Sequence, residues 1–86
     1  MIKKIHYTSS FLKSVKKLSF KDKKIIKKRE QIFRKNPFDA KLKTHKLKGK
    51  LKGLYSFSIT YSQRILFEFI KKNEVVFYEV GGHDIY

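Results

Sequence analysis

The spacing of apolar residues in the N-terminal half predicts a short strand followed by a helix. Residues 2–7 combine β-branched and aromatic side chains, which favours a strand. Hydroxyl residues at positions 8–10 then offer N-cap groups to a following helix. The apolar residues of this helix recur at helical spacing, with lysines between them: Phe11, Leu12, Val15 and Leu18.

A second helix is expected to begin directly afterwards. Ser19 and Asp22 resemble a capping box with Asp in place of Glu, and Asp22 suits the positive end of the helix dipole. The apolar positions that follow share one face: Ile25, Ile26, Ile32 and Phe33. Asn36 and Pro37 end the helix. Because the link between the two helices is tight, they should form an antiparallel hairpin.

The C-terminal half changes to the alternation of β-strands. Residues 38–47 are expected to connect the two halves. The stretch 54–61 places Tyr55, Phe57, Ile59 and Tyr61 on one face and Ser56, Ser58 and Thr60 on the other. A turn at 62–63 leads to a strand over 64–70, and a turn at 72–73 leads to a strand over 74–80. In this last strand Val76, Tyr78 and Val80 should share one face, opposite Val75, Phe77 and Glu79.

This order of elements, β-α-α-β-β-β, predicts an α+β fold in a single domain over residues 1–86. The N-terminal helical hairpin should pack on one face of a small, mainly antiparallel sheet. The other face, which carries Ser58, Arg64, Glu68 and Glu79, should stay open to solvent or to a ligand.

The charge balance indicates an anionic partner. The chain has 22 Lys and Arg residues against 7 Asp and Glu residues, a net charge of +15. So much positive charge opposes compaction, and it suits binding to nucleic acid, an anionic membrane or an acidic protein. There is no cysteine, no signal-peptide pattern and no apolar run near the roughly 20 residues of a membrane span. These features predict a cytoplasmic protein without a membrane role.

Three stretches resemble the RelE/ParE toxin superfamily, in its RelE, YoeB and YafQ branch. They are HKLKGKLKGLYSF at residues 45–57, QRILFEF at 63–69 and VGGHDIY at 80–86. The resemblance implies a RelE-like domain and a type II toxin neutralised by a cognate antitoxin. It also implies an mRNA interferase: an endoribonuclease that enters the ribosomal A site, cleaves mRNA and inhibits translation. The free toxin should be a monomer that forms a higher-order complex with an acidic antitoxin.

RNA cleavage by its own 2′-hydroxyl, without a metal or other cofactor, needs a base, an acid and a cation that stabilises the phosphorane. Arg64, on the predicted open face, matches the phosphate-binding arginine of the family, and a guanidinium suits a phosphate. His83 can exchange protons near neutral pH, and Tyr86 matches a C-terminal aromatic residue that stacks on a base or assists proton transfer. His45 and Glu79 complete the catalytic candidates. The residues expected to contact RNA are Lys46, Lys48, Lys50, Lys52 and Ser58.

The sequence also departs from the family pattern and leaves other functions open. Ser56 and Ser58 stand where well-studied relatives carry lysines or histidines, and Glu79 stands where some carry arginine. The alternatives to a nuclease are a toxin that poisons DNA gyrase and a catalytically weak RNA-binding module. A purely structural alternative for Arg64 is an ion pair with Glu68 or Glu79.

Overall fold

The computed structural model describes residues 1–86, except for the side chain of His83. Its strands are β1 (Lys4–Tyr7), β2 (His45–Lys46), β3 (Tyr55–Ser58), β4 (Arg64–Lys71) and β5 (Glu74–Gly81). Its helices are α1 (Ser9–Lys16) and α2 (Phe20–Lys35), and three short 3-10 helices complete it: η1 (Ala40–Leu42), η2 (Gly49–Leu51) and η3 (His83–Ile85). The α+β fold is therefore confirmed, and the predicted order of elements holds apart from the additional strand β2.

Both helices begin where the sequence predicts, because hydroxyl side chains cap them. The Thr8 side chain accepts a hydrogen bond from the Phe11 N–H, and the Ser19 side chain accepts one from the Asp22 N–H. These bonds satisfy amide groups that lack partners in the first turn of a helix. α2 ends at Lys35, directly before Asn36 and Pro37.

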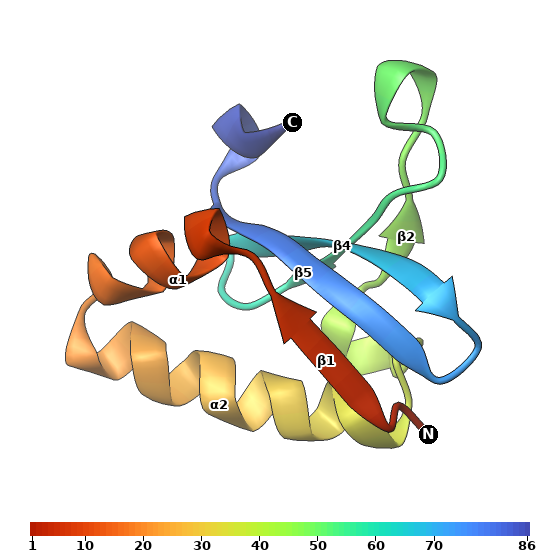
Figure 1. Ribbon diagram of the computed structural model, residues 1–86. Coiled ribbons are helices and arrows are strands. Elements are labelled where there is room, and N and C mark those ends of the chain that lie inside the picture. The colour runs from red at the N-terminus through yellow and green to blue at the C-terminus, as the bar shows by residue number, and fades with distance from the viewer.

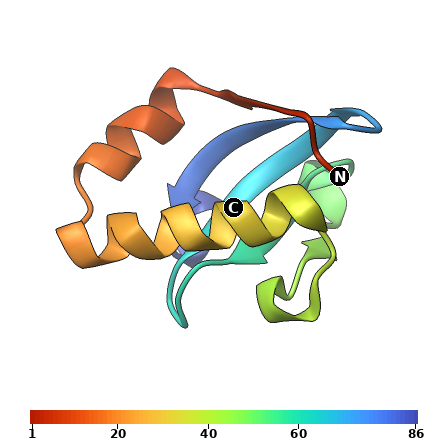
Figure 2. The same ribbon diagram turned by 90° about the horizontal axis from the view of Figure 1, so that it is seen from below.

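The five strands form one mixed sheet in the order β1-β5-β4-β3-β2. β1 runs parallel to β5, and the other neighbouring pairs are antiparallel. Figures 1 and 2 show α1 and α2 together on one face of the sheet, while η3 and the segment containing β2 and η2 project from the other side. Within the described residues, no helix is long and apolar enough to cross a membrane.

Aromatic rings fill the space between α2 and the sheet. Phe33 is fully buried and packs against the rings of Phe57, Phe67 and Phe77 at centroid distances of 4.8, 4.9 and 5.3 Å. Because each buried ring removes a large apolar area from water, this cluster supplies much of the stability of so small a core. It confirms the apolar face predicted for α2.

The strand predicted over residues 54–61 is shorter than expected, and two of its side chains lie differently. β3 ends at Ser58, and the chain then turns through residues 59–63. The prediction that Tyr61 points to the core is wrong, since its side chain is fully exposed in this turn. Ser56 faces away from the helices as predicted, yet it is fully buried rather than open to solvent.

A β-bulge in β5 changes the faces predicted for its end. Leu66 pairs with Glu79, but the next residue of β4, Phe67, pairs with Phe77, so Tyr78 is the extra residue. The bulge shifts the alternation by one position. Val80 therefore joins Val75 and Phe77 in the core, whereas the sequence pattern placed it with Tyr78 on the opposite face. The prediction that Val75 and Phe77 share the open face with Glu79 is also wrong, since both are fully buried.

The segment predicted as a plain connection contains a further strand. His45 pairs with Ser56 and Lys46 with Tyr55, so β2 extends the sheet beyond β3. β2 covers only the first half of β3. The outer edge of β3 near Ser58 therefore lies beyond the reach of β2.

Candidate functional site

Arg64 lies at the start of β4, between β3 and the end of β5. It pairs with Ser58 on one side and with Gly81 on the other. Its guanidinium donates a hydrogen bond to the Tyr86 hydroxyl at 3.3 Å and lies 5.8 Å from the centroid of the Tyr86 ring. The middle of the sheet thus carries a cation on the face opposite the helices, as the sequence predicted.

A chain of hydrogen bonds continues from Tyr86 to His45. The Tyr86 hydroxyl donates to Ser56 Oγ at 2.7 Å, and Ser56 Oγ lies 3.4 Å from His45 Nε2. His45 Nδ1 lies 3.2 Å from the carbonyl oxygen of Lys43. Since a carbonyl only accepts, this contact requires a proton on Nδ1, and in the neutral imidazole that tautomer leaves a lone pair on Nε2. Three of the five predicted catalytic residues, Arg64, Tyr86 and His45, are therefore brought together.

The C-terminal turn holds Tyr86 in this position. η3 folds back over the end of β5, and a Cβ atom at Gly81 would lie only 2.6 Å from Ile85 Cγ2. Because Gly81 has no side chain, η3 can pack this close to the end of β5. His83 belongs to the same turn, and its side chain, which carries the predicted chemistry, lies outside the described residues.

Not all donors of the Arg64 guanidinium have a hydrogen-bond partner among the described residues. Its Nε atom is buried and has no hydrogen-bond partner among the described residues, and the same holds for Oε1 of the neighbouring Gln63. A buried donor without an acceptor is costly. A bound oxyanion is a suitable acceptor for this N–H group, which agrees with the phosphate-binding role expected for Arg64.

Glu79 lies outside this group of residues. Its carboxylate accepts hydrogen bonds from Ser10 Oγ at 2.5 Å and from Ser14 Oγ, both on α1. Burial acts to raise the pKa of Glu79, but these two hydroxyls and the Val80 N–H lower it more, so the pKa lies below its usual range. Through these hydrogen bonds the Glu79 carboxylate links α1 to β5. Glu68 likewise accepts from the Tyr78 hydroxyl at 2.6 Å, so the described contacts of both acids lie elsewhere than on Arg64.

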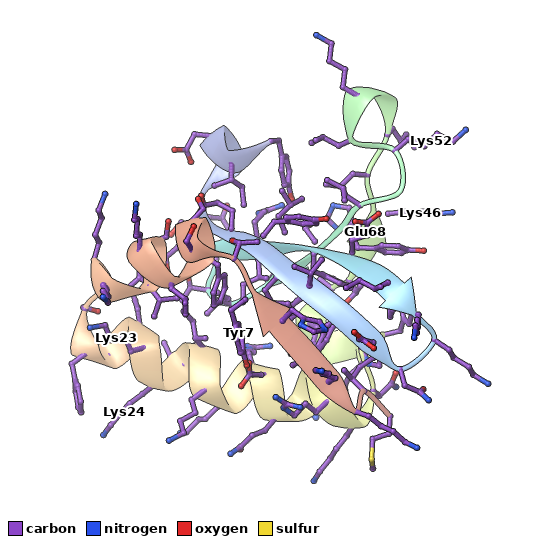
Figure 3. All side chains as sticks on the ribbon, in the orientation of Figure 1. Tyr7, Lys23, Lys24, Lys46, Lys52 and Glu68 are labelled. Atoms are coloured by element: carbon purple, nitrogen blue, oxygen red, sulfur yellow. The ribbon has the colours of Figure 1, made fainter. Side chains whose placement is uncertain are left out.

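The lysines expected to contact RNA lie on the segment from β2 through η2. All four, Lys46, Lys48, Lys50 and Lys52, are exposed. Figure 3 shows Lys46 and Lys52 extending outward from this segment, away from the helices. Ser58 is half-buried, opposite Arg64. A row of exposed cations thus starts directly beside His45.

Sequence reasoning missed Ser56 as part of the site and missed a second group of cations altogether. Strand alternation places Ser56 on the face of Arg64, but only the pairing of β2 with β3 brings His45 next to it. A hollow of about 390 Å³ is lined by Arg29, Lys41, Lys43 and Arg64 together with residues 58–61. These cations come from separate elements, so their spacing along the chain carries no signal. Among the described residues, no three His, Cys, Asp or Glu side chains group as metal ligands.

Comparison with known proteins finds similarity at the level of structure. No family model and no curated protein sequence matches the chain. A copper-bound mutant toxin from Helicobacter pylori superposes with a TM-score of 0.78 at 27% identity, over 99% of this chain and 98% of that one. YafQ from E. coli gives a TM-score of 0.79 at 21% identity, over 94% and 93%. A YoeB–YefM complex from Staphylococcus aureus gives 0.77 at 21% identity, over 96% and 98%.

The fold thus defines a small toxin-type α+β domain, with two helices on one sheet face and a polar, cationic site on the other. More specifically, it is the fold of the solved toxins YafQ and YoeB, and this likeness agrees with the resemblance that the motifs at residues 45–57, 63–69 and 80–86 carry.

Proposed function

We propose that this chain is the toxin of a type II toxin-antitoxin system and acts as a ribosome-dependent endoribonuclease that needs no metal. The observation that carries the proposal is the hydrogen-bonded series from Arg64 through Tyr86 and Ser56 to His45. It combines a cation, an aromatic ring and a titratable imidazole on one face of the sheet. Cleavage by the 2′-hydroxyl requires a base, an acid and a cation, and the imidazole and the guanidinium can supply the base and the cation.

In the proposed reaction, Arg64 binds the scissile phosphate. As the 2′-oxygen attacks phosphorus, negative charge grows on the phosphorane oxygens. The planar guanidinium can donate two parallel hydrogen bonds to two of these oxygens, and its buried Nε–H is one such donor. We expect the contribution of Arg64 to rest on this charge stabilisation rather than on proton transfer, because a guanidinium stays protonated.

His45 is the general base of this proposal. The contact between Nδ1 and the Lys43 carbonyl leaves a lone pair on Nε2, which faces the Ser56 hydroxyl at 3.4 Å and exchanges it for the 2′-hydroxyl when RNA binds. The base takes the 2′-hydroxyl proton, the 2′-oxygen bonds to phosphorus, and the bond to the 5′-oxygen breaks. The products are a 2′,3′-cyclic phosphate and a 5′-hydroxyl, whose proton comes from His83. Tyr86, positioned by Ser56 and Arg64, stacks on a base next to the cut.

The test is primer extension on a reporter mRNA in a purified translation system. We compare the wild-type chain with Arg64→Ala and with Lys72→Ala, a control that removes an exposed cation at the β4–β5 turn. The proposal predicts cuts at A-site codons for the wild type and Lys72→Ala. It predicts no cuts for Arg64→Ala, and none when ribosomes are omitted.

Two outcomes would overturn the nuclease. Intact mRNA with inhibited DNA supercoiling by gyrase would identify a gyrase poison. Intact mRNA with no effect on gyrase, together with retained RNA binding, would identify an RNA-binding module without cleavage.

We also propose a cognate acidic antitoxin as the partner. Its support is the net charge of +15 and the solved complex of YoeB with YefM. An acidic segment that folds onto the basic surface would gain both charge pairing and ordered contacts. Mixing the purified chain with the product of a neighbouring gene should give a larger species in size-exclusion chromatography. Separate elution of the two proteins would contradict the pairing.

A further inference from the structure

We propose that the hollow lined by Arg29, Lys41 and Lys43 is a second RNA subsite, which holds a backbone phosphate next to the nucleotide at Arg64. The inference rests on the proposed RNA substrate but concerns other residues. The hollow measures about 390 Å³, and no acidic side chain lines it. Arg64 lines it as well, so it adjoins the proposed cleavage site.

Three separate elements bring the cations to this hollow. Arg29 comes from the middle of α2, Lys41 lies in η1, and Lys43 follows η1. Figure 2 shows η1 in lime green and the turn at 59–63 in teal, both on the β3 side of α2. The hollow lies where β2 no longer pairs with β3, so an extended strand of RNA can leave the Arg64 face along this edge.

The Arg29 guanidinium is positioned rather than merely exposed, and the backbone at Lys43 is unusual. Arg29 Nη1 donates to the Lys41 carbonyl at 2.7 Å, which fixes the guanidinium beside η1 and leaves its other N–H groups for a ligand. Lys43 has φ of +52°, the only non-glycine residue with a positive φ among the described residues. A lysine is disfavoured in this left-handed conformation, where glycine or asparagine is usual. The presence of lysine at this position is consistent with a need for its ammonium group.

An aromatic ring on the rim favours RNA over an acidic peptide. Tyr61 lines the hollow and its side chain is fully exposed. Sites for single-stranded nucleic acid combine cations that follow the backbone with rings on which bases stack. A carboxylate ligand would need the cations but not the ring. The pairing of Tyr61 with Arg29, Lys41 and Lys43 therefore matches one nucleotide: its phosphate in the hollow and its base on the ring.

The experiment measures binding of a fluorescently labelled 2′-O-methyl hexanucleotide, which cannot be cleaved, by anisotropy across a range of salt concentrations. The key variant is Lys43→Gly, because glycine accepts the left-handed conformation and the fold is preserved while the charge is lost. It is combined with Lys41→Gln. Tyr61→Ala tests the ring, and Lys71→Gln with Lys72→Gln is the control that removes two exposed lysines at the distant β4–β5 turn.

For the pair Lys41→Gln and Lys43→Gly we expect about 10-fold weaker binding and a salt slope of log K reduced by about 0.7, the value for one lost phosphate contact on a single strand. Tyr61→Ala should weaken binding while leaving the salt slope unchanged, since stacking releases no counterions. The control pair should bind as the wild type does.

Three results would overturn the subsite. These are wild-type binding by the hollow variants, equal loss in the control pair, and loss restricted to an acidic probe such as hexa-aspartate. The last result would assign the hollow to an acidic peptide instead. Failure of the nuclease proposal is distinguishable, because it appears as intact mRNA in the translation assay even if the hexanucleotide binds through this hollow. Conversely, mRNA cleavage could depend on Arg64 while the hollow variants bind the hexanucleotide as the wild type does. That combination would contradict only the subsite.

Discussion

The two faces of the sheet use the same strands for opposite purposes. The face under α2 is closed by four packed phenylalanines at positions 33, 57, 67 and 77, all fully buried. The other face carries Arg64, His45 and Tyr86 around a single buried serine, Ser56. On the first face the four rings pack against one another. On the second face a buried guanidinium N–H has no hydrogen-bond partner among the described residues.

This difference shows how so small a domain separates stability from chemistry. Alternation along β3 sends Phe57 to the core and Ser56 to the site, so adjacent residues contribute to different properties. Substitutions on the core face should therefore lower the free energy of unfolding and affect activity only through unfolding. Substitutions on the polar face should lower activity in a chain that stays folded.

The largest effect on stability is expected for Phe33→Ala. Removing this fully buried ring leaves a cavity against Phe57, Phe67 and Phe77, which costs about 3–5 kcal/mol. That is a large part of the stability of a small domain. Urea denaturation followed by circular dichroism measures the change.

Phe20→Ala is the matched control for that variant, because it removes the same ring from the same helix at a position that is 74% exposed. The Nζ atom of Lys24 lies 4.9 Å from the centroid of this ring. We expect a change of about 0.5 kcal/mol or less. Equal losses for the two variants would contradict the assignment of the core to this face.

The largest effect on activity without loss of stability is expected for Arg64→Lys. The charge is retained, but the planar fork that fits two phosphate oxygens is lost. We expect the rate of mRNA cleavage to fall by about 100-fold, the scale of losing one donor to a charged transition state. The midpoint of urea denaturation should stay within the error of the wild type. A nearly active Arg64→Lys variant would indicate that only charge matters at this position.

A smaller effect is expected from the hydrogen bond between Tyr86 and Ser56. Ser56→Ala and Tyr86→Phe each remove one partner of the 2.7 Å bond. If the bond positions the ring for stacking, the double variant should be no worse than either single variant. The coupling energy in a double-mutant cycle of cleavage rates should then be about 1 kcal/mol. Additive losses would mean that the two side chains act independently.

Local signals in the sequence were enough for most of the fold. The caps at Thr8 and Ser19, the helical spacing around Phe33 and the alternation in β4 depend on neighbours along the chain, and the structure confirms them. The bulge at Tyr78 and the short strand β2 were not predicted. Both depend on pairing between strands, which two-residue periodicity does not encode.

The site was predictable only where a motif carried it. Arg64, His45 and Tyr86 were identified from the family motifs, and the structure brings them together, although their catalytic roles stay predictions. Ser56 was missed because a serine in an alternating strand carries no signal of burial. Glu79 was named as a candidate because the pattern placed it on the polar sheet face, while its position beside α1 depends on tertiary packing.

The smallest expected effect is on the stability of a Glu79 variant. The pH dependence of this effect distinguishes a structural carboxylate from a catalytic one. The pKa of Glu79 is lowered in the folded chain, so its ionised form stabilises the fold at pH values above its ordinary value of 4.5, and this stabilisation is lost as the pH falls through the lowered pKa. Glu79→Gln should therefore cost about 1 kcal/mol at pH 7, the low end for hydrogen bonds to a partly exposed charge. The difference from the wild type should shrink in acid.

Glu74→Gln is the control for that variant, since Glu74 is also a β5 glutamate with a lowered pKa, in this case through the His6 side chain at 2.5 Å. The Glu74 pair lies at the surface, so its loss should change stability less than loss of the contact between Glu79 and α1. Thermal unfolding from pH 7 down to pH 3, with cleavage measured at pH 7, tests both variants. If Glu79→Gln kept full stability but lost cleavage, the carboxylate would belong to the chemistry of the polar face after all, and the division between the two faces would fail at that residue.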